Sequence, residues 1–344
     1  MGFVRTEPTL FRYSVGKCQS MNNYLITGGA GFIGSHLAEK LVNDGHRVAV
    51  IDDLSTGSVD NISHLLTNTN FQFARADVNE QVVLDRMASE SNVIIHLAAA
   101  VGVELVVERP VHTIETNVRG TESVLQAGLR YGKRVLVAST SEVYGKGAKV
   151  PFSEEDDVLL GATSKSRWGY AASKMVDEFL ALAYRREYGL DAVVFRLFNT
   201  VGPRQSSRYG MVIPRFVRQA LNNKPITVYG DGQQSRCFCD VRDVTEAICK
   251  LAVLSLDDER VFNIGGTTEI TILDLAKLVK EITNSESEIV FVPYSEAYAP
   301  GFEDMSRRVP DITRIHRMIG WLPTIEVNQT ISDVTYQHKN VVIK

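Results

Sequence analysis

The sequence predicts an α/β protein in which a doubly wound parallel sheet carries a second, smaller mixed α/β lobe. Two observations lead to this prediction. Short β-branched runs recur through the first 200 residues with helical patterns between them, and a glycine-rich turn joins the first run to the first helix. The runs are almost continuously hydrophobic, as strands buried on both faces of a parallel sheet are. From about residue 200 onward, prolines punctuate shorter elements, which indicates the lobe.

The expected strands follow one another in chain order, with a helix predicted around apolar positions such as Val124 and Leu125. The strands are expected at residues 23–27, 47–51, 71–74, 93–97, 134–138 and 192–197. We assign residues 21–200 to the sheet domain and residues 201–344 mainly to the lobe, with some of its segments returning to the sheet. Residues 1–20 lack the continuous apolar stretch of a signal peptide and are interpreted as a leader outside the fold.

The composition is that of an ordinary globular protein. Of the 344 residues, 44% are hydrophobic and 23% are charged, which suffices for a full core. The net charge of −4 argues against a nucleic-acid or membrane-surface partner, and no apolar run reaches the ~18 residues of a membrane span. The four cysteines contain no CxxC pair, so we expect reduced thiols of a cytoplasmic protein and no metal site.

The glycine-rich turn predicts a dinucleotide site. Gly28, Gly31 and Gly34 are spaced GxxGxxG between a strand and a helix. The first glycine permits the tight turn, the second lets the backbone approach a pyrophosphate, and the third allows close packing of helix and strand. Asp52 ends the next strand, where its carboxylate can accept both ribose hydroxyls and would repel a 2′-phosphate. The combination predicts a Rossmann-type domain that binds NAD rather than NADP.

Further cofactor contacts are expected in the glycine turn and at the carboxyl ends of the strands, where ligands of such sheets bind. Asp77 follows the third strand, where it can meet an adenine amine. The expected contacts beside it are Phe32, Ile33, Val78, Leu97, Ala98 and Ala99.

A tyrosine and a lysine indicate proton-transfer chemistry. Tyr170 and Lys174 are four residues apart and share one face if the segment is helical. An ammonium beside a phenol favours phenolate and lowers the phenol pKa from about 10 toward neutrality. Tyr170 can then accept the proton of a substrate hydroxyl while hydride leaves to NAD. The hydroxyls of the segment 139–141, just after the fifth strand, are placed to orient that substrate.

Several motifs together resemble one enzyme family. They are GGAGFIGSHL from residue 28, HLAA from 96, STSEVYG from 139, YAASK from 170, RLFNTVGPR from 196 and VYGDGQQSRCFCDVRDV from 228. In this order, over about residues 22–335, they resemble the extended short-chain dehydrogenase/reductase family, whose members are nucleotide-sugar epimerases, dehydratases and decarboxylases. The resemblance implies a homodimer built from helices, one of which carries Tyr170.

The resemblance also implies roles for individual residues. Thr140, Tyr170 and Lys174 match the catalytic triad of the family, and Lys174 also matches the residue that holds the nicotinamide ribose. Asn117 matches a residue that orders the catalytic region. Asn199 and Arg236 match contacts to the substrate diphosphate, for which an arginine fork is suited.

The reaction depends on groups beyond the triad. Ser141 and Glu142 after Thr140 resemble decarboxylases and 4,6-dehydratases, and Arg308 takes the place of the active-site arginine of decarboxylases, where it can face a C6 carboxylate. UDP-glucuronate decarboxylation through a 4-keto sugar is therefore expected, with 4-epimerisation of a UDP-sugar as an open alternative. A 4,6-dehydratase is less favoured. A regulator that senses NAD without chemistry is disfavoured because the triad is intact.

Overall fold

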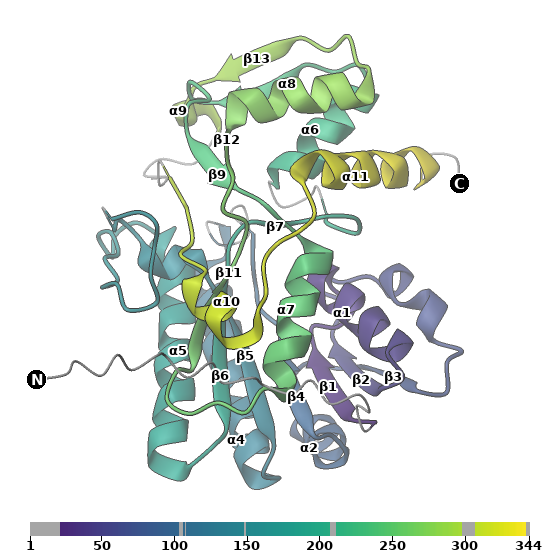
Figure 1. Cartoon of the computed structure of the whole chain (residues 1–344), viewed down its shortest axis with the longest axis vertical. Coiled ribbons are helices and arrows are strands. Elements are labelled where there is room, and N and C mark those ends of the chain that lie inside the picture. Colours follow the sequence, from purple (N-terminus) through teal and green to yellow (C-terminus); the bar gives the residue numbers. More distant parts are fainter. Residues whose placement is uncertain are drawn as a thin grey trace, which may run out of the picture.

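The computed structural model describes residues 21–102, 106, 108–147, 149–206, 211–297 and 307–341. The leader expected at residues 1–20 lies outside this part of the chain. The largest unit is a parallel sheet of seven strands in the order β11-β6-β5-β4-β1-β2-β3 (Figure 1). Its strands are β1 (Asn23–Thr27), β2 (Arg47–Asp52), β3 (Phe71–Arg75), β4 (Val93–His96), β5 (Arg134–Thr140), β6 (Ala192–Leu197) and β11 (Val261–Ile264).

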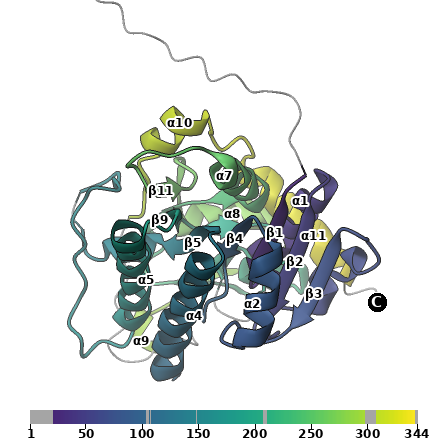
Figure 2. The same ribbon diagram turned by 90° about the horizontal axis from the view of Figure 1, so that it is seen from below.

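Helices cover both faces of this sheet, which confirms the predicted fold class. Figure 2 shows α2, α4 and α5 on one face and α1 and α7 on the other. Each face buries its own apolar layer, because successive strand residues point to opposite faces. Ile26 of β1 belongs to the layer on one face, and Ile94 of β4 belongs to the layer on the other. The helices are α1 (Phe32–Asn43), α2 (Gln81–Glu90), α4 (Pro110–Arg130), α5 (Trp168–Tyr188) and α7 (Val241–Val253).

The six strands expected from the sequence all form, with bounds that differ by no more than two residues at one end. β5 extends to Thr140, so that the strand delivers this hydroxyl to the carboxyl edge of the sheet. The seventh strand, β11, comes from the chain after residue 200 and pairs with β6 through Val261 and Val194. The sheet therefore draws on both halves of the sequence.

The smaller lobe lies beyond the carboxyl edge of the large sheet (Figure 1). Its own apolar core includes Phe216, Val228, Leu275 and Ile331, contributed by three helices and one strand. Its elements are β7 (Thr200–Val201), α6 (Val212–Leu221), β8 (Ile226–Tyr229), β9 (Ser235–Cys237), β10 (Cys239–Asp240), β12 (Glu269–Thr271), α8 (Ile272–Thr283), β13 (Ile289–Val292), α9 (Tyr294–Ala297) and α11 (Val327–Val341). Helix α10 (Thr313–Ile319) returns to pack near β11.

Tight turns precede several sheet strands at the edge opposite the lobe. Gly45, Gly132 and Gly189 have positive φ values of 86°, 60° and 74° and end α1, α4 and α5. A Cβ atom added at any of them would meet no atom within 4 Å. The short helices η1 (Val59–Asn61), η2 (Ser63–Leu65) and η3 (Ser141–Tyr144) complete the described elements.

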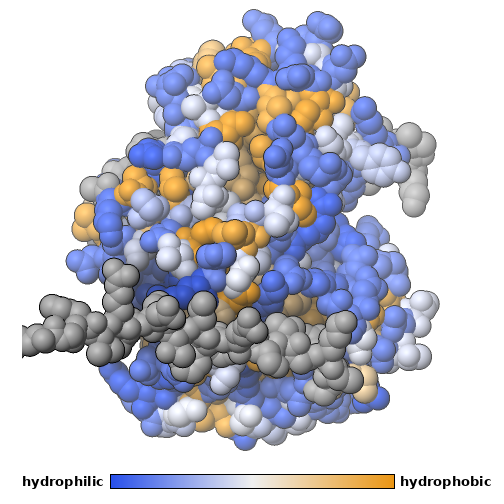
Figure 3. All heavy atoms as spheres, in the orientation of Figure 1, coloured by the Kyte–Doolittle hydropathy of each residue, from blue (hydrophilic) through white to orange (hydrophobic). Residues whose placement is uncertain are grey.

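The face of the molecule shown in Figure 3 is mainly polar. Figure 3 shows hydrophilic residues over most of one face, with smaller apolar groups between them. Among the described helices, none combines the length and the apolar character required to cross a bilayer.

Candidate active site

A large cavity lies where the carboxyl edge of the sheet faces the lobe. Its volume is about 780 Å³, and residues from both halves of the chain line it. Gly28 and Asp52 line one end, Thr140 and Tyr170 the middle, and Arg236 the lobe end. The position matches the ligand crevice of doubly wound sheets.

The glycine turn is packed too closely to accept a side chain at two of its glycines. Gly28 has a φ of 72°, and a Cβ there would lie 2.7 Å from the Ala98 backbone nitrogen. A Cβ at Gly34 would lie 2.3 Å from the Gly28 oxygen, so that the start of α1 packs tightly on the turn. Gly31 precedes α1 and lines the cavity, where the free N–H groups of the first helical turn favour a phosphate.

The Asp52 carboxylate is fixed by two backbone donors. Ala30 N donates to Oδ2 and Leu54 N to Oδ1, each at 2.9 Å. Burial raises the pKa of this carboxyl, and the two backbone hydrogen bonds oppose the rise. Since a carboxylate oxygen accepts more than one hydrogen bond, Asp52 retains capacity for the ribose hydroxyls of NAD. The turn and this carboxylate together fit the expected dinucleotide.

The other expected cofactor residues divide into two groups. Phe32, Ile33, Asp77, Val78, Leu97, Ala98 and Ala99 line the cavity. Asn117 is buried and is not one of the lining residues. Its Oδ1 accepts from Ala100 N at 2.8 Å and its Nδ2 donates to Ser173 Oγ at 3.0 Å. Asn117 therefore ties the loop after β4 to α5 next to Lys174, a positioning contact.

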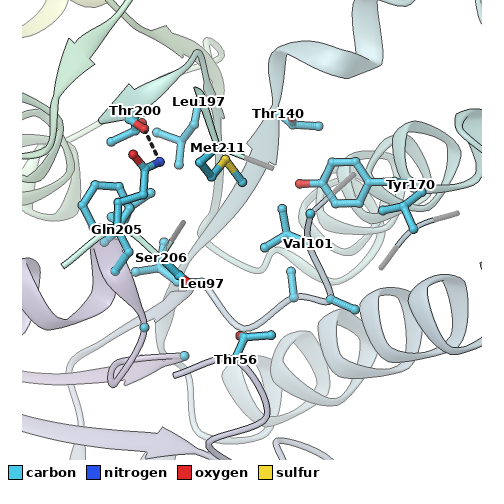
Figure 4. Close-up of a pocket in the computed structure, with 18 of the residues that line it drawn as sticks. Thr56, Leu97, Val101, Thr140, Tyr170, Leu197, Thr200, Gln205, Ser206 and Met211 are labelled. Carbon is cyan, nitrogen blue, oxygen red and sulfur yellow. Dashed lines mark hydrogen bonds between the residues drawn. The ribbon is translucent and has the colours of Figure 1, made fainter. Parts of the chain in front are cut away.

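Tyr170 and Thr140 lie together on one side of the cavity. In Figure 4 the phenol oxygen of Tyr170 points into the cavity beside Thr140, which ends β5. Burial raises the pKa of Tyr170 above its ordinary value, the Glu142 and Asp177 carboxylates raise it further, and the Thr140 hydroxyl opposes the rise.

Lys174 differs from the expectation. It lies one helical turn beyond Tyr170, is 3% exposed and is not among the residues that line the cavity. Its Nζ donates to Asp177 Oδ2 at 2.7 Å. The pKa of Tyr170 is raised in the protein alone, chiefly by burial, and Lys174 is not among the groups that lower it.

Glu142 lies between two arginines on the cavity wall. Its Oε1 is 3.3 Å from a terminal guanidinium nitrogen of Arg308 and 4.0 Å from one of Arg167. All three residues line the cavity together with Ser141. Arg308 reaches this wall from the segment before Pro310, although 166 positions separate it from Glu142. The structure thus brings together the residues expected to distinguish a decarboxylase.

A buried polar network supports this wall from behind. Ser139 Oγ donates to Glu178, and the Arg196 guanidinium donates to both Glu178 oxygens at 2.9 and 2.7 Å. Arg196 also donates to the Tyr144 hydroxyl, which in turn donates to Asn263 Oδ1 at 2.7 Å. The network joins β5, β6, β11, η3 and α5, so it fixes the turn that presents Thr140 and Glu142.

The lobe end of the cavity carries cations and aromatic rings. Arg236 is 7% exposed on β9, and Asn199 donates its amide to Cys237 O at 2.9 Å; both residues line the cavity. Arg215, which was not predicted, lies over the Tyr229 ring with its guanidinium carbon 3.9 Å from the ring centroid. These groups suit an anionic nucleotide with a flat base.

Comparison with known proteins decides the family. The sequence profile of the family described as GDP-mannose 4,6 dehydratase matches residues 25–334. The chain belongs to the GDP-mannose 4,6 dehydratase family. This confirms the resemblance to extended short-chain dehydrogenase/reductase enzymes, and the chain is accordingly an enzyme.

Individual members of the GDP-mannose 4,6 dehydratase family and its structural neighbours differ in reaction. A UDP-N-acetyl-alpha-D-glucosaminuronate decarboxylase of Bacillus cytotoxicus is 42% identical over 313 residues, covering 90% of this chain and 95% of the relative. UDP-glucuronic acid decarboxylase 1 of Arabidopsis thaliana is 36% identical over 334 residues, covering 96% and 73%. A mutant UDP-glucuronic acid 4-epimerase from Bacillus cereus, solved with a fluorinated UDP-glucuronic acid and NAD, is 27% identical with a TM-score of 0.83, covering 93% and 99%.

Two arginines of this family member were not predicted as site residues. Arg167 stands three residues before Tyr170 and was given no role in the sequence analysis. Arg215 lies on α6, in a segment without a distinctive motif. Arg167 lines the cavity because α5 begins beside η3. Arg215 lines it because the lobe folds over the sheet. A search for arginines near each predicted motif would have found Arg167.

Proposed function

We propose that the chain is an NAD-dependent decarboxylase of UDP-hexuronates. It oxidises C4 of the sugar, releases C6 as CO₂ and restores a hydroxyl at C4. One observation carries the proposal: Arg308 and Arg167 flank Glu142 on the wall that also holds Thr140 and Tyr170. Together these three charged side chains carry one net positive charge, which suits a substrate with one carboxylate. A neutral C6 hydroxymethyl group would leave that buried charge without compensation.

NAD is proposed as the cofactor because the cavity supplies the glycine turn, the start of α1 and the Asp52 carboxylate at one end. NAD bound there would supply the acceptor for the C4 hydride and would return that hydride when the ketone is reduced. Gly28, Gly31 and Gly34 would hold the pyrophosphate, and Asp52 the ribose hydroxyls. The remaining chemistry belongs to side chains of the chain itself.

Proton transfer at C4 is assigned to Tyr170. Its phenolate accepts the proton of the C4 hydroxyl, and the hydroxyl of Thr140 holds that substrate oxygen in place. Arg236 and Asn199 hold the diphosphate at the lobe end, where an arginine fork binds phosphate oxygens in pairs. The sugar then extends from the lobe toward Tyr170.

Loss of CO₂ follows from the 4-ketone. The C6 carboxylate, bound by Arg308 and Arg167, is β to that ketone. When the C5–C6 bond breaks, its electron pair moves toward the ketone oxygen and CO₂ leaves. C5 then takes up a proton, and Glu142, held 3.3 Å from Arg308, is the acid–base group on that side of the cavity. Ser141 lies beside it with its side chain buried.

The test is product analysis with UDP-glucuronate, UDP-N-acetylglucosaminuronate and UDP-glucose as separate substrates. We expect both hexuronates or one of them to lose the mass of CO₂, and UDP-glucose to remain unchanged. An unchanged mass with a new sugar spectrum would instead establish 4-epimerisation, which the neighbouring epimerase structures favour as the second candidate. Loss of the mass of water would establish a dehydratase.

We also propose a homodimer in a reducing, cytoplasmic compartment. Exposed apolar side chains lie on the two helices that pack against each other, Val111 on α4 and Val176 and Phe179 on α5, with Phe179 66% exposed. Such a paired face suits burial against a second copy. Cys237, Cys239 and Cys249 are free thiols, which supports a reducing environment. Native mass spectrometry of wild type and Phe179→Glu tests the dimer, and a monomeric wild type would contradict it.

A further inference from the structure

The position of Arg308 depends on a short stretch of chain, residues 308–311, which we call the return segment. Figure 1 shows the chain before α10 running from the lobe toward the large sheet. There Phe152 N donates to Val309 O and Asp311 N donates to Phe152 O, each at 2.8 Å. These two hydrogen bonds join the return segment to the loop that follows η3.

The side chain of Asn263, on β11, binds both sides of this junction. Its Nδ2 donates to Phe152 O at 2.9 Å and to Asp311 O at 3.1 Å, so both amide hydrogens are used. Its Oδ1 accepts from the Tyr144 hydroxyl at 2.7 Å, and its backbone N donates to Glu154 Oε1 at 2.9 Å. Asn263 is fully buried. One carboxamide therefore ties together β11, η3, the loop after η3 and the return segment.

Packing holds the return segment from a second direction. A Cβ atom added at Gly265, just after β11, would lie 3.1 Å from Pro310 Cγ and 2.6 Å from Phe198 Cβ. The proline ring therefore lies directly against the backbone that follows β11. The Phe152 ring is stacked on Tyr144, with 4.7 Å between the ring centroids and 6° between the planes. The return segment thus has a defined place against β11 and η3.

This arrangement bears on the cavity through the first residue of the return segment. Arg308 lies 3.3 Å from Glu142 of η3, and both side chains line the cavity. Since η3 also contains Tyr144, Asn263 contacts the turn that carries Glu142 as well as the segment that carries Arg308. Misplacement of a substrate-positioning group by about 1 Å can cost about 100-fold in rate. The guanidinium therefore depends on the contacts that hold the return segment.

We propose that Asn263 is a positioning residue that holds Arg308 at the site of the sugar carboxylate and thereby sets the preference of the enzyme for a hexuronate over a neutral hexose. The inference rests on the proposed binding of that carboxylate by Arg308. Asn263 is not among the residues that line the cavity, so it acts through the return segment. Thr140 and Tyr170 belong to β5 and α5, which the return segment does not include.

The experiment measures binding in a Tyr170→Phe background, in which turnover does not disturb the titration. The NAD-loaded protein is titrated calorimetrically with UDP-glucuronate and with UDP-glucose, and the ratio of the two dissociation constants is the preference. We expect the background to favour UDP-glucuronate by at least about tenfold, as for a hydrogen bond to a charged group. Asn263→Ser in this background should lower the preference to about threefold or less, because serine cannot reach both carbonyl oxygens.

Three further variants sharpen the test. Tyr144→Phe removes the donor to Asn263 Oδ1 but leaves both Nδ2 bonds, so it should keep more of the preference than Asn263→Ser. Asp243→Asn alters another buried side chain, which binds Thr324 and does not line the cavity. It should lower the free energy of unfolding without changing the preference. Pro310→Ala keeps the hydrogen bonds but loosens the contact with the backbone after β11, so it should lower the preference by a smaller factor.

An unchanged preference in Asn263→Ser, or an equal loss in Asp243→Asn, would overturn the inference. If Asn263→Ser does not fold, Pro310→Ala carries the test, and an unchanged preference there overturns the inference. A background without any preference would overturn it too, because Arg308 would then not bind the carboxylate. Failure of decarboxylation itself would appear in the product analysis of the wild type, whereas failure of this inference would appear in the binding ratio.

Discussion

Glu142 and Arg308 meet on one wall of the cavity with 3.3 Å between a carboxylate oxygen and a guanidinium nitrogen, although 166 positions separate them in the chain. The contact brings a segment that follows the lobe back to the turn after β5. A sugar carboxylate placed beside Tyr170 could therefore bind to Arg308, which comes from a later part of the chain than the sheet domain.

Replacement of Arg308 tests this contact. Arg308→Gln should lower kcat/KM for UDP-glucuronate by about 10- to 100-fold, as expected for loss of a hydrogen bond to a charged group. Arg307→Gln is the matched control, because Arg307 is the adjacent arginine but is exposed and pairs with Glu269. Steady-state kinetics of both variants decides the point, and equal losses in the two would argue against a specific role for Arg308.

Tyr170→Phe should reduce turnover by at least about 100-fold, since it removes the group that accepts the C4 proton. NAD should still bind, because the glycine turn and Asp52 are untouched. Tyr184→Phe, on the same helix but outside the cavity lining, is the control. Turnover assays combined with calorimetric NAD titration check both statements, and wild-type turnover in Tyr170→Phe would disprove the assigned role.

Asp52→Asn should narrow the preference for NAD over NADP. The carboxylate accepts ribose hydroxyls and repels a 2′-phosphate, so its removal should weaken NAD binding by about tenfold and strengthen NADP binding. Asp60→Asn is the control, because Asp60 is exposed and is not among the residues that line the cavity. Calorimetric titration with both dinucleotides provides the measurement. Selectivity that stays at the wild-type level in Asp52→Asn would contradict the assignment.

The buried ion pair of Glu178 and Arg196 should contribute strongly to the free energy of unfolding. Glu178→Gln leaves the Arg196 guanidinium buried with an uncharged partner, and we expect a loss of about 3–5 kcal/mol in the free energy of unfolding. The double variant Glu178→Gln/Arg196→Met should recover part of it. Urea unfolding gives both values. A loss below about 1 kcal/mol would mean that the network contributes little.

Two histidines should make the protein sensitive to acid. Burial lowers the pKa of His36 to about 4, where it contacts Pro203 O, and that of His96 to about 3. Since an unfolded histidine has a pKa near 6.5, the unfolded state binds more protons below this pH. Each histidine therefore makes its full contribution to the free energy of unfolding above pH ~6.5. Below this pH the contribution falls by up to about 1.4 kcal/mol per pH unit until pH ~4.

Urea unfolding at about pH 7 and about pH 5 tests this dependence. The difference between the two values should shrink in His36→Gln, because that side chain no longer takes up a proton on unfolding. His112→Gln, which alters an exposed histidine, should keep the wild-type difference. A wild-type stability that is constant over this range would contradict the prediction.

The strands of the sheet domain were predictable because burial on both faces selects continuous β-branched runs. RVAVI and AVVFRL are such runs, and their observed bounds agree closely with the expected ones. β11 was not predicted as an individual strand, since Val261–Ile264 is short and follows the lobe elements. Its pairing with β6 depends on the path of the chain through the lobe, which no local pattern encodes.

The site was predictable where motifs lie at strand ends. Thr140 and Tyr170 lie together because α5 packs against β5 on one face of the sheet. The pairing of Lys174 with Asp177 was not anticipated, although both positions lie on one helix. Spacing permits Lys174 to approach either Tyr170 at i−4 or Asp177 at i+3, and the structure pairs its ammonium with Asp177.

The glycine-ended turns at the edge of the sheet away from the lobe offer a practical route for engineering. Gly45, Gly132 and Gly189 have open space where a side chain would project, and the cavity lies at the other end of the strands. A short peptide inserted beside Gly132 would leave the reaction chamber unobstructed. Enzyme attached to a solid support through such an insertion should present its entrance to the surrounding solution.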